Sequence, residues 1–151
     1  MIRKKIDRYI ANFLAFILAF MVLNVLWQVF TRFVLSNPSS FTDELARYLM
    51  IWVGLLGAAY VSGKNGHVAI DVLSKKLNDK KKKNLDFFVH SLIFVFALLV
   101  LVIGGLRLVY ITAKLNQHSP ALNIPLAVVY AVIPLSGLLI MYYKFNDLIT
   151  K

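Results

Sequence analysis

The sequence predicts an all-α integral membrane protein with four transmembrane helices, and three observations favour this fold class. Hydrophobic residues make up 60% of the 151 residues and charged residues 16%, whereas a soluble domain is about 45–50% apolar. The apolar residues fall in four continuous runs, each near the roughly 20 residues that a membrane-spanning helix needs. The basic residues gather on one side of such a four-span arrangement. Continuous runs also exclude a membrane β-barrel, because its strands alternate in hydrophobicity.

The four predicted helices lie at about 9–33, 45–62, 85–113 and 124–143. Together they form a single membrane domain over 1–151, because the connections are too short for a soluble domain. A helix of about 29 residues reaches about 43 Å, which exceeds the roughly 30 Å bilayer core, so the third helix is expected to tilt or project. Pro134 predicts a kink in the fourth helix, because proline removes a backbone donor and crowds the preceding turn.

The net charge of +10 predicts the orientation of these helices. Thirteen of the 17 Lys and Arg residues lie before the first helix, between the second and third helices, or after the fourth. Because Lys and Arg favour the cytoplasmic side, both termini are expected in the cytoplasm, with loops 34–44 and 114–123 facing outward. The lysine run at 80–83 then lies near anionic lipid head groups. Membrane lipids are therefore expected partners, and nucleic acid is not.

The segment between the second and third helices predicts a short amphipathic helix in the cytoplasmic interface. Ile70, Leu73 and Leu77 fall on one side of a helical projection, and polar residues take the other side. The chain has no cysteine, which excludes disulfides and cysteine-ligated metals. The sequence contains no recognisable nucleophile–base set, metal cluster or phosphate loop. An enzyme is therefore not expected, and neither is a metal or cofactor in this chain.

Two residue patterns predict helix packing or a subunit interface. Asn24, Gln28 and Arg32 are spaced four apart, so they form one polar stripe on the first helix. Hydrogen bonds between helices are the favoured interpretation of this stripe, and a subunit interface or a substrate path are the alternatives. On the second helix, the small residues Gly54, Ala58 and Ser62 would let a neighbouring helix approach closely. The pattern does not say whether that neighbour belongs to this chain.

A charged group marks the start of the second helix. Asp43 and Glu44 fall in its first turn, where the helix dipole favours carboxylates, and Ser40 or Thr42 is positioned to cap it. Asp43 and Arg47 are four apart and can pair along the helix. Arg32 lies within reach across the loop. The group is either a capped, salt-bridged helix start or a partly buried network for outer-face docking or assembly, and both interpretations stay open here.

This part of the chain resembles the small permease subunit of tripartite ATP-independent periplasmic (TRAP) transporters. The resemblance begins in "QVFTRFVLSNPSSFTDELARYLMIWVGLLGAAYVSGKNGHVAID". Its matching residues are Gln28, Arg32-Phe33, Pro38, Phe41, Asp43-Glu44, Ala46-Arg47, Trp52, Gly57-Ala58 and Gly66-His67-Val68. The region of the last helix is similar to the family through Pro120, Leu122, Pro125, Tyr130 and Pro134. The family often has tryptophan where Phe41 stands, and an aromatic residue remains there.

The resemblance implies a function that the residues alone do not. It implies a scaffold in the bacterial inner membrane that pairs with a large multi-span permease subunit. That partner carries the substrate and sodium sites. A soluble periplasmic substrate-binding protein delivers an organic acid, such as sialic acid, another sugar acid or a C4-dicarboxylate. Arg32, Asp43, Glu44 and Arg47 would brace the outer end and help to dock that protein. The alternative is a membrane assembly or lipid-binding protein with no part in transport.

Overall fold

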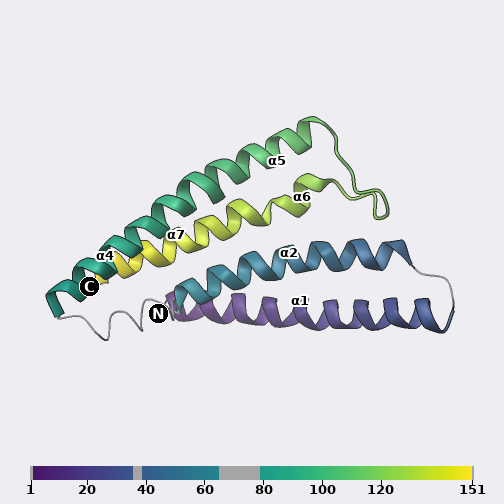
Figure 1. The fold of residues 1–151 in the computed structure, drawn as a ribbon, viewed down its shortest axis with the longest axis horizontal. Helices are drawn as coiled ribbons and strands as arrows, with labels where there is room; N and C mark the ends of the chain where they lie inside the picture. The colour runs from purple at the N-terminus through teal and green to yellow at the C-terminus, as the bar shows by residue number, and fades with distance from the viewer. Residues whose placement is uncertain (1, 36–38, 65–78, 151) are drawn as a thin grey trace.

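The computed structural model describes residues 2–35, 39–64 and 79–150, and these residues are mainly helical (Figure 1). The helices in chain order are α1 (Ile2–Phe33), α2 (Ser40–Gly63), α4 (Asp79–Phe96), the π-helix η1 (Ala97–Gly104), α5 (Gly105–Lys114), α6 (Leu126–Tyr130) and α7 (Val132–Thr150). Four helical segments are long and apolar enough to cross a membrane. The prediction of an all-α protein with four transmembrane helices is therefore confirmed. The predicted interfacial helix at 70–77, Pro38 and residues 66–68 lie outside the described residues.

The observed helices extend beyond the apolar runs that predicted them. α1 begins at Ile2 rather than near residue 9, and α2 begins at Ser40 rather than near residue 45. The apolar run marks only the part that must avoid water, whereas backbone hydrogen bonds continue into polar flanks that contain good helix formers. α4, η1 and α5 follow one another without a break and form the third spanning segment.

The spanning helices lie side by side in one layer, in the order α1, α2, α7 and α4–α5 (Figure 1). α1 packs mainly on α2, α2 packs also on α7, and α7 packs on the third spanning segment. At most 33% of the most apolar window of each spanning helix is buried. Most of the apolar surface is therefore left for lipid or for another protein.

Two small clusters form the core of this layer. Leu14, Leu56 and Val132 join α1, α2 and α7. Ala59, Ala97 and Ile140 form the second cluster, which joins α2, η1 and α7. The contact between α7 and the third spanning segment depends on glycine. A Cβ atom on Gly137 would lie 2.7 Å from Cβ of Leu101, so only a residue without a side chain permits this approach.

The fourth spanning segment is interrupted at Ala131, between α6 and α7. Pro134 lies one turn further on and has no N–H to donate to the carbonyl of Tyr130, so one bond of the helical ladder is missing here, and the next one, from Leu135 N–H to Ala131 O, is stretched to 3.4 Å. The kink predicted from Pro134 therefore appears as a short break in the helix. It changes the direction of the chain near the end of the molecule where residues 115–125 join α5 to α6. That end is called the loop end below, and the opposite end, where α1 begins and α7 ends, is called the terminal end.

Candidate functional site

The candidate site lies at the loop end, and its first component is the compact loop after α5. Gln117 N–H donates to Thr112 O over 3.1 Å and Asn116 N–H to Ala113 O over 3.1 Å. These two bonds form a Schellman motif, which requires a left-handed residue just past the helix. Asn116 supplies that residue with φ 47°, and asparagine is one of the few side chains that tolerate this conformation.

The same loop is closed by its own backbone bonds. Ser119 N–H donates to Ile124 O over 2.9 Å, and Asn123 N–H donates to Ser119 O over 3.0 Å. Asn123 is left-handed as well, with φ 53°. The N–H groups of Ala121 and Leu122 lie within this turn, and that of Leu122 also donates to Ser119 Oγ over 3.2 Å.

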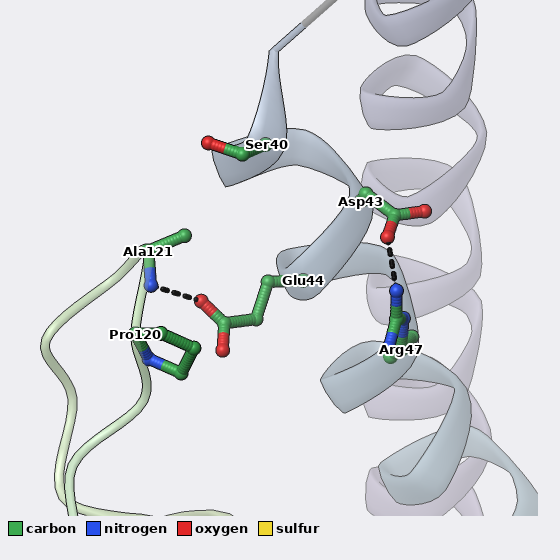
Figure 2. A pocket seen from close by; sticks show the side chains of 6 residues that line it. All are labelled: Ser40, Asp43, Glu44, Arg47, Pro120 and Ala121. Atoms are coloured by element: carbon green, nitrogen blue, oxygen red, sulfur yellow. Dashed lines mark hydrogen bonds and ion pairs between the residues drawn. The ribbon is translucent and has the colours of Figure 1, made fainter.

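Glu44 of α2 accepts both of these loop N–H groups, and Figure 2 shows the bond from Ala121. Its Oε2 atom lies 2.8 Å from Ala121 N and 2.9 Å from Leu122 N. Its Oε1 atom accepts a 2.8 Å hydrogen bond from the Tyr48 hydroxyl, one helical turn along. Charge-assisted bonds of this kind are stronger than neutral ones. Glu44 therefore fastens the loop at 119–122 to the start of α2.

Asp43 points to the other side of α2, toward α1 (Figure 2). It forms an ion pair with Arg47, and the side chains are 48% and 72% exposed. Gln28 of α1 donates to Asp43 Oδ1 over 3.3 Å. The charge of Arg32 acts on Asp43 at longer range, but among the described residues Arg32 forms no ion pair.

The four predicted charges thus divide into two groups. Successive residues on a helix are about 100° apart, so Asp43 and Glu44 cannot face the same neighbour. Asp43, paired with Arg47, faces α1, whereas Glu44 faces the loop after α5. Arg32 belongs to α1 and acts on Asp43 only through its charge. The exposure of the Asp43–Arg47 pair leaves it available to a partner at the loop end.

The predicted cap of α2 is wrong in detail. Ser39 is the N-cap residue and makes no side-chain cap bond. Ser40 is already the first helical residue, and the Thr42 hydroxyl donates to Ser39 O over 2.8 Å instead of accepting from a free N–H. Because the helix begins earlier than its apolar run, the predicted capping residues fall inside its first turn.

The polar stripe on α1 lies against this start of α2. Asn24 is buried, and its Nδ2 atom donates to Thr42 O over 2.7 Å. Gln28 makes the bond to Asp43 described above. Together, these two hydrogen bonds join α1 to the start of α2, in addition to the apolar cluster around Leu14 and Leu56.

The small residues of α2 do not share one face. Gly54 and Ala58 are exposed, and no atom lies within 4 Å of a Cβ built on Gly54. Ser62 is buried at the terminal end, where its carbonyl accepts a bond from Lys144. Four residues turn the helix by about 40° more than one full turn. Ser62, two such steps after Gly54, therefore lies on the side of α2 that faces α7. The part of this chain that the structure describes therefore leaves the face of Gly54 uncovered.

A pocket of about 360 Å³ lies between the start of α2 and the loop after α5. Its lining consists of Ser40, Asp43, Glu44, Arg47, Pro120 and Ala121 (Figure 2). Among residues 2–35, 39–64 and 79–150 no group of His, Cys, Asp or Glu side chains could hold a metal ion. The pocket combines an exposed ion pair with apolar loop atoms, and this chemistry suits contact with a polar protein surface.

Sequence reasoning missed the partners of Glu44. Tyr48 lies four residues after it, a spacing that signals a contact along a helix. The loop partners are 77 and 78 residues away in the chain and carry no comparable signal. Sequence reasoning also missed the contacts of Asp147 with Arg3 and His90 at the terminal end.

Four apolar spanning helices in one layer, with a small polar site at one end, are typical of a multi-pass membrane protein. Residues 21–151 match the family described as tripartite ATP-independent periplasmic transporters, DctQ component. The chain belongs to this family of TRAP transporter small permease subunits. This membership confirms the resemblance noted from the sequence, and it makes the chain a transporter subunit and not an enzyme.

Three relatives illustrate the family. A putative TRAP transporter small permease protein of Haemophilus influenzae is 28% identical over 134 residues, which cover 89% of this chain and 81% of the relative. The sialic acid TRAP transporter permease protein SiaT of Haemophilus influenzae is 37% identical over 68 residues, covering 45% of this chain and 11% of SiaT. The C4-dicarboxylate TRAP transporter small permease protein DctQ of Rhodobacter capsulatus is 32% identical over 105 residues, covering 68% of this chain and 44% of the relative.

Proposed function

We propose that this chain is the fixed scaffold of a sodium-coupled importer of an organic acid. Its partners are a large multi-span permease subunit, which binds substrate and sodium, and a soluble periplasmic binding protein. The observation that carries the proposal is the distribution of carboxylates. The sequence holds no Asp or Glu at 8–42, 45–70 or 87–146. The apolar middle of the layer therefore has no carboxylate to bind a sodium ion. In this proposal another subunit supplies the sodium site.

The large partner also accounts for the shape of the layer. Gly54 and Ala58 are exposed on α2, and most of the apolar surface has no cover from the described residues. Small residues favour close contact between membrane helices. In SiaT, the matching region is only 11% of a much longer permease chain, which supports direct contact between a domain of this kind and a larger one.

Sialic acid is the preferred substrate within this proposal, and a C4-dicarboxylate is the alternative. One relative is described as a sialic acid permease and another as a C4-dicarboxylate small permease. Both compounds are carboxylic acids, so the proposed substrate class is an organic acid. In this proposal the binding protein and the large subunit choose between them.

The proposed location is the bacterial inner membrane, with both termini in the cytoplasm. The basic residues in the first turns of α1 and at 80–83 support this orientation, since Lys and Arg favour the cytoplasmic side. The loop end then faces the periplasm. Its exposed Asp43–Arg47 pair and the nearby Arg32 are the proposed docking groups for the binding protein.

Reconstitution tests the proposal directly. Proteoliposomes would contain this chain alone, the chain with the large subunit, or the chain with both partners, and uptake of labelled sialic acid would be measured with and without an inward sodium gradient. Uptake is expected only with all components and the gradient, and it should require the binding protein to be loaded. Sodium-driven uptake by this chain alone would overturn the scaffold role.

A further inference from the structure

A second polar cluster lies at the terminal end, and the site described above makes no use of it. It consists of Arg3, Asp7, Ser62, Gly63, His90, Tyr143, Lys144 and Asp147 and is called the terminal cluster. These residues come from α1, α2, α4 and α7, so all four spanning segments contribute to it. Charged side chains are rarely buried at a membrane boundary without a function or a partner.

Asp147 is at the centre of the terminal cluster and is 6% exposed. Its Oδ1 atom accepts a 2.8 Å hydrogen bond from Nη1 of Arg3, the residue 144 positions earlier. Its Oδ2 atom lies 3.9 Å from Nζ of Lys144 and 3.8 Å from Nε2 of His90. One carboxylate thus faces basic groups from three different helices.

Lys144 is the least accessible of these basic groups, with no exposed surface. Its Nζ atom donates to Ser62 O over 3.1 Å, at the last turn of α2. Arg3 also donates to the carbonyl of the next residue, Gly63, and its side chain is 31% exposed. The two cations therefore close the carbonyl end of α2, where the helix dipole favours positive charge.

Two further contacts join α1 to α7. The Tyr143 hydroxyl donates to Asp7 Oδ1 over 2.6 Å, and the Tyr143 ring lies beneath the Arg3 guanidinium. His90 Nδ1 lies 2.7 Å from the backbone oxygen of Asp86, so Nδ1 must carry the donated proton. In neutral His90 the remaining atom, Nε2, is then an acceptor facing another acceptor, Asp147 Oδ2, and both atoms lack a hydrogen-bond partner.

We propose that Asp147 is the shared counter-ion that holds the terminal ends of α1, α2 and α7 together. This role goes beyond the scaffold function proposed above, because it states what keeps the layer rigid. The described residues of the layer form two small apolar clusters, and α1 and α4 lie on opposite edges of it. A fixed angle between the helices therefore depends on contacts of this kind.

Arg3 and Lys144 should respond differently to the loss of the Asp147 carboxylate. In an Asp147→Asn variant, Arg3 can turn its partly exposed side chain to water, but the fully buried Lys144 cannot. Removing one member of a buried ion pair is strongly destabilising, whereas replacing both members is tolerated better. Lys144→Gln in the same chain should therefore recover part of the loss, and this recovery identifies the pair.

The test is a thermal melt of the full-length chain in detergent, followed by size-exclusion chromatography. Asp147→Asn is expected to lower the apparent Tm by about 5 °C or more, and Arg3→Gln should lower it by less. Arg8→Gln is the matched control, because Arg8 is an exposed arginine on the same helix, and it should melt like the parent. Asp147→Asn with Lys144→Gln should melt above Asp147→Asn alone.

Two results would overturn the proposal. One is a parental melting temperature for Asp147→Asn. The other is additive losses from Asp147→Asn and Lys144→Gln, which would mean that the two residues do not interact. If Asp147→Asn fails to accumulate in membranes, the same comparison is made on expression level, where Lys144→Gln must restore the protein. The melt does not involve the large subunit, so its outcome is independent of the transport proposal.

Discussion

At the scale of single residues, neighbouring carboxylates on α2 have different functions. Glu44 is bound by two loop N–H groups and by the Tyr48 hydroxyl. Asp43 pairs with Arg47 at an exposed position. Exposed ion pairs contribute little to stability, whereas unsatisfied N–H groups are costly when they have no water to bond instead. Glu44 should therefore matter for structure and Asp43 for contact with other proteins.

Substitution of each acid by its amide tests this difference. Glu44→Gln keeps the shape but weakens the acceptor, so the loop at 119–122 should open more often. A single cysteine in place of Ala121 should then react several-fold faster with a thiol reagent. Asp43→Asn is the matched control and should leave the rate unchanged, because Asp43 does not touch the loop. Equal rates in all three proteins would mean that Glu44 does not hold the loop.

Part of this site could be predicted from the sequence. The pairing of Asp43 with Arg47 follows from their spacing of four on a helix. The bonds from Glu44 could not be predicted, because its loop partners are backbone atoms more than 75 residues away and any sequence would offer N–H groups there. What fixes them is the left-handed Asn123 and the closed turn around it, and a turn of this kind has no strong sequence pattern.

At the scale of helices, Gly54 of α2 and Gly137 of α7 have opposite functions. A Cβ atom on Gly54 would meet nothing within 4 Å, whereas one on Gly137 would lie 2.7 Å from Leu101 and 2.9 Å from Val102. The glycine of α7 is thus required by packing inside this chain. The glycine of α2 lies on a face that no described residue covers, so its small size can matter only to something outside this part of the chain.

A pair of glycine substitutions separates these functions. Gly137→Ala should destabilise the isolated chain by about 1–3 kcal/mol, because extra atoms in a packed contact force the helices apart. Gly54→Leu should leave the isolated chain as stable as the parent and should reduce its co-purification with the large permease subunit. Melting curves and pull-downs of the same two variants provide the measurements. Normal co-purification of Gly54→Leu would assign this face to lipid instead.

The number of spanning helices could be predicted from the sequence, but their arrangement in one layer could not. Runs such as Leu98–Ile103 are apolar on every side, so periodicity does not show which face meets a neighbour. A kink near Pro134 could be predicted from the sequence, because proline removes a backbone donor from the helix. The order α1, α2, α7 and α4–α5 depends on contacts such as Gly137 against Leu101, which only the folded chain reveals.

At the scale of the whole molecule, the two ends of the layer are chemically different. The terminal end holds a buried cluster around Asp147, and the loop end holds an exposed ion pair beside a pocket of about 360 Å³. A buried cluster stabilises the helices from within, whereas an exposed one can meet a partner. The proposed docking of a periplasmic protein therefore requires that the loop end faces the periplasm.

Thiol labelling on intact cells determines that orientation. The chain has no cysteine, so any single introduced cysteine reports without background. His118 at the loop end and Lys82 near the start of α4 are both exposed, and each would be replaced by cysteine in turn. With the basic residues on the cytoplasmic side, an impermeant reagent should label position 118 on intact cells and position 82 only after the membrane is opened. The reverse pattern would put the exposed Asp43–Arg47 pair in the cytoplasm. That outcome would remove the docking proposal, yet it would leave the family, the four-helix layer and the function of Asp147 unchanged, because none of these depends on which side the loop end faces.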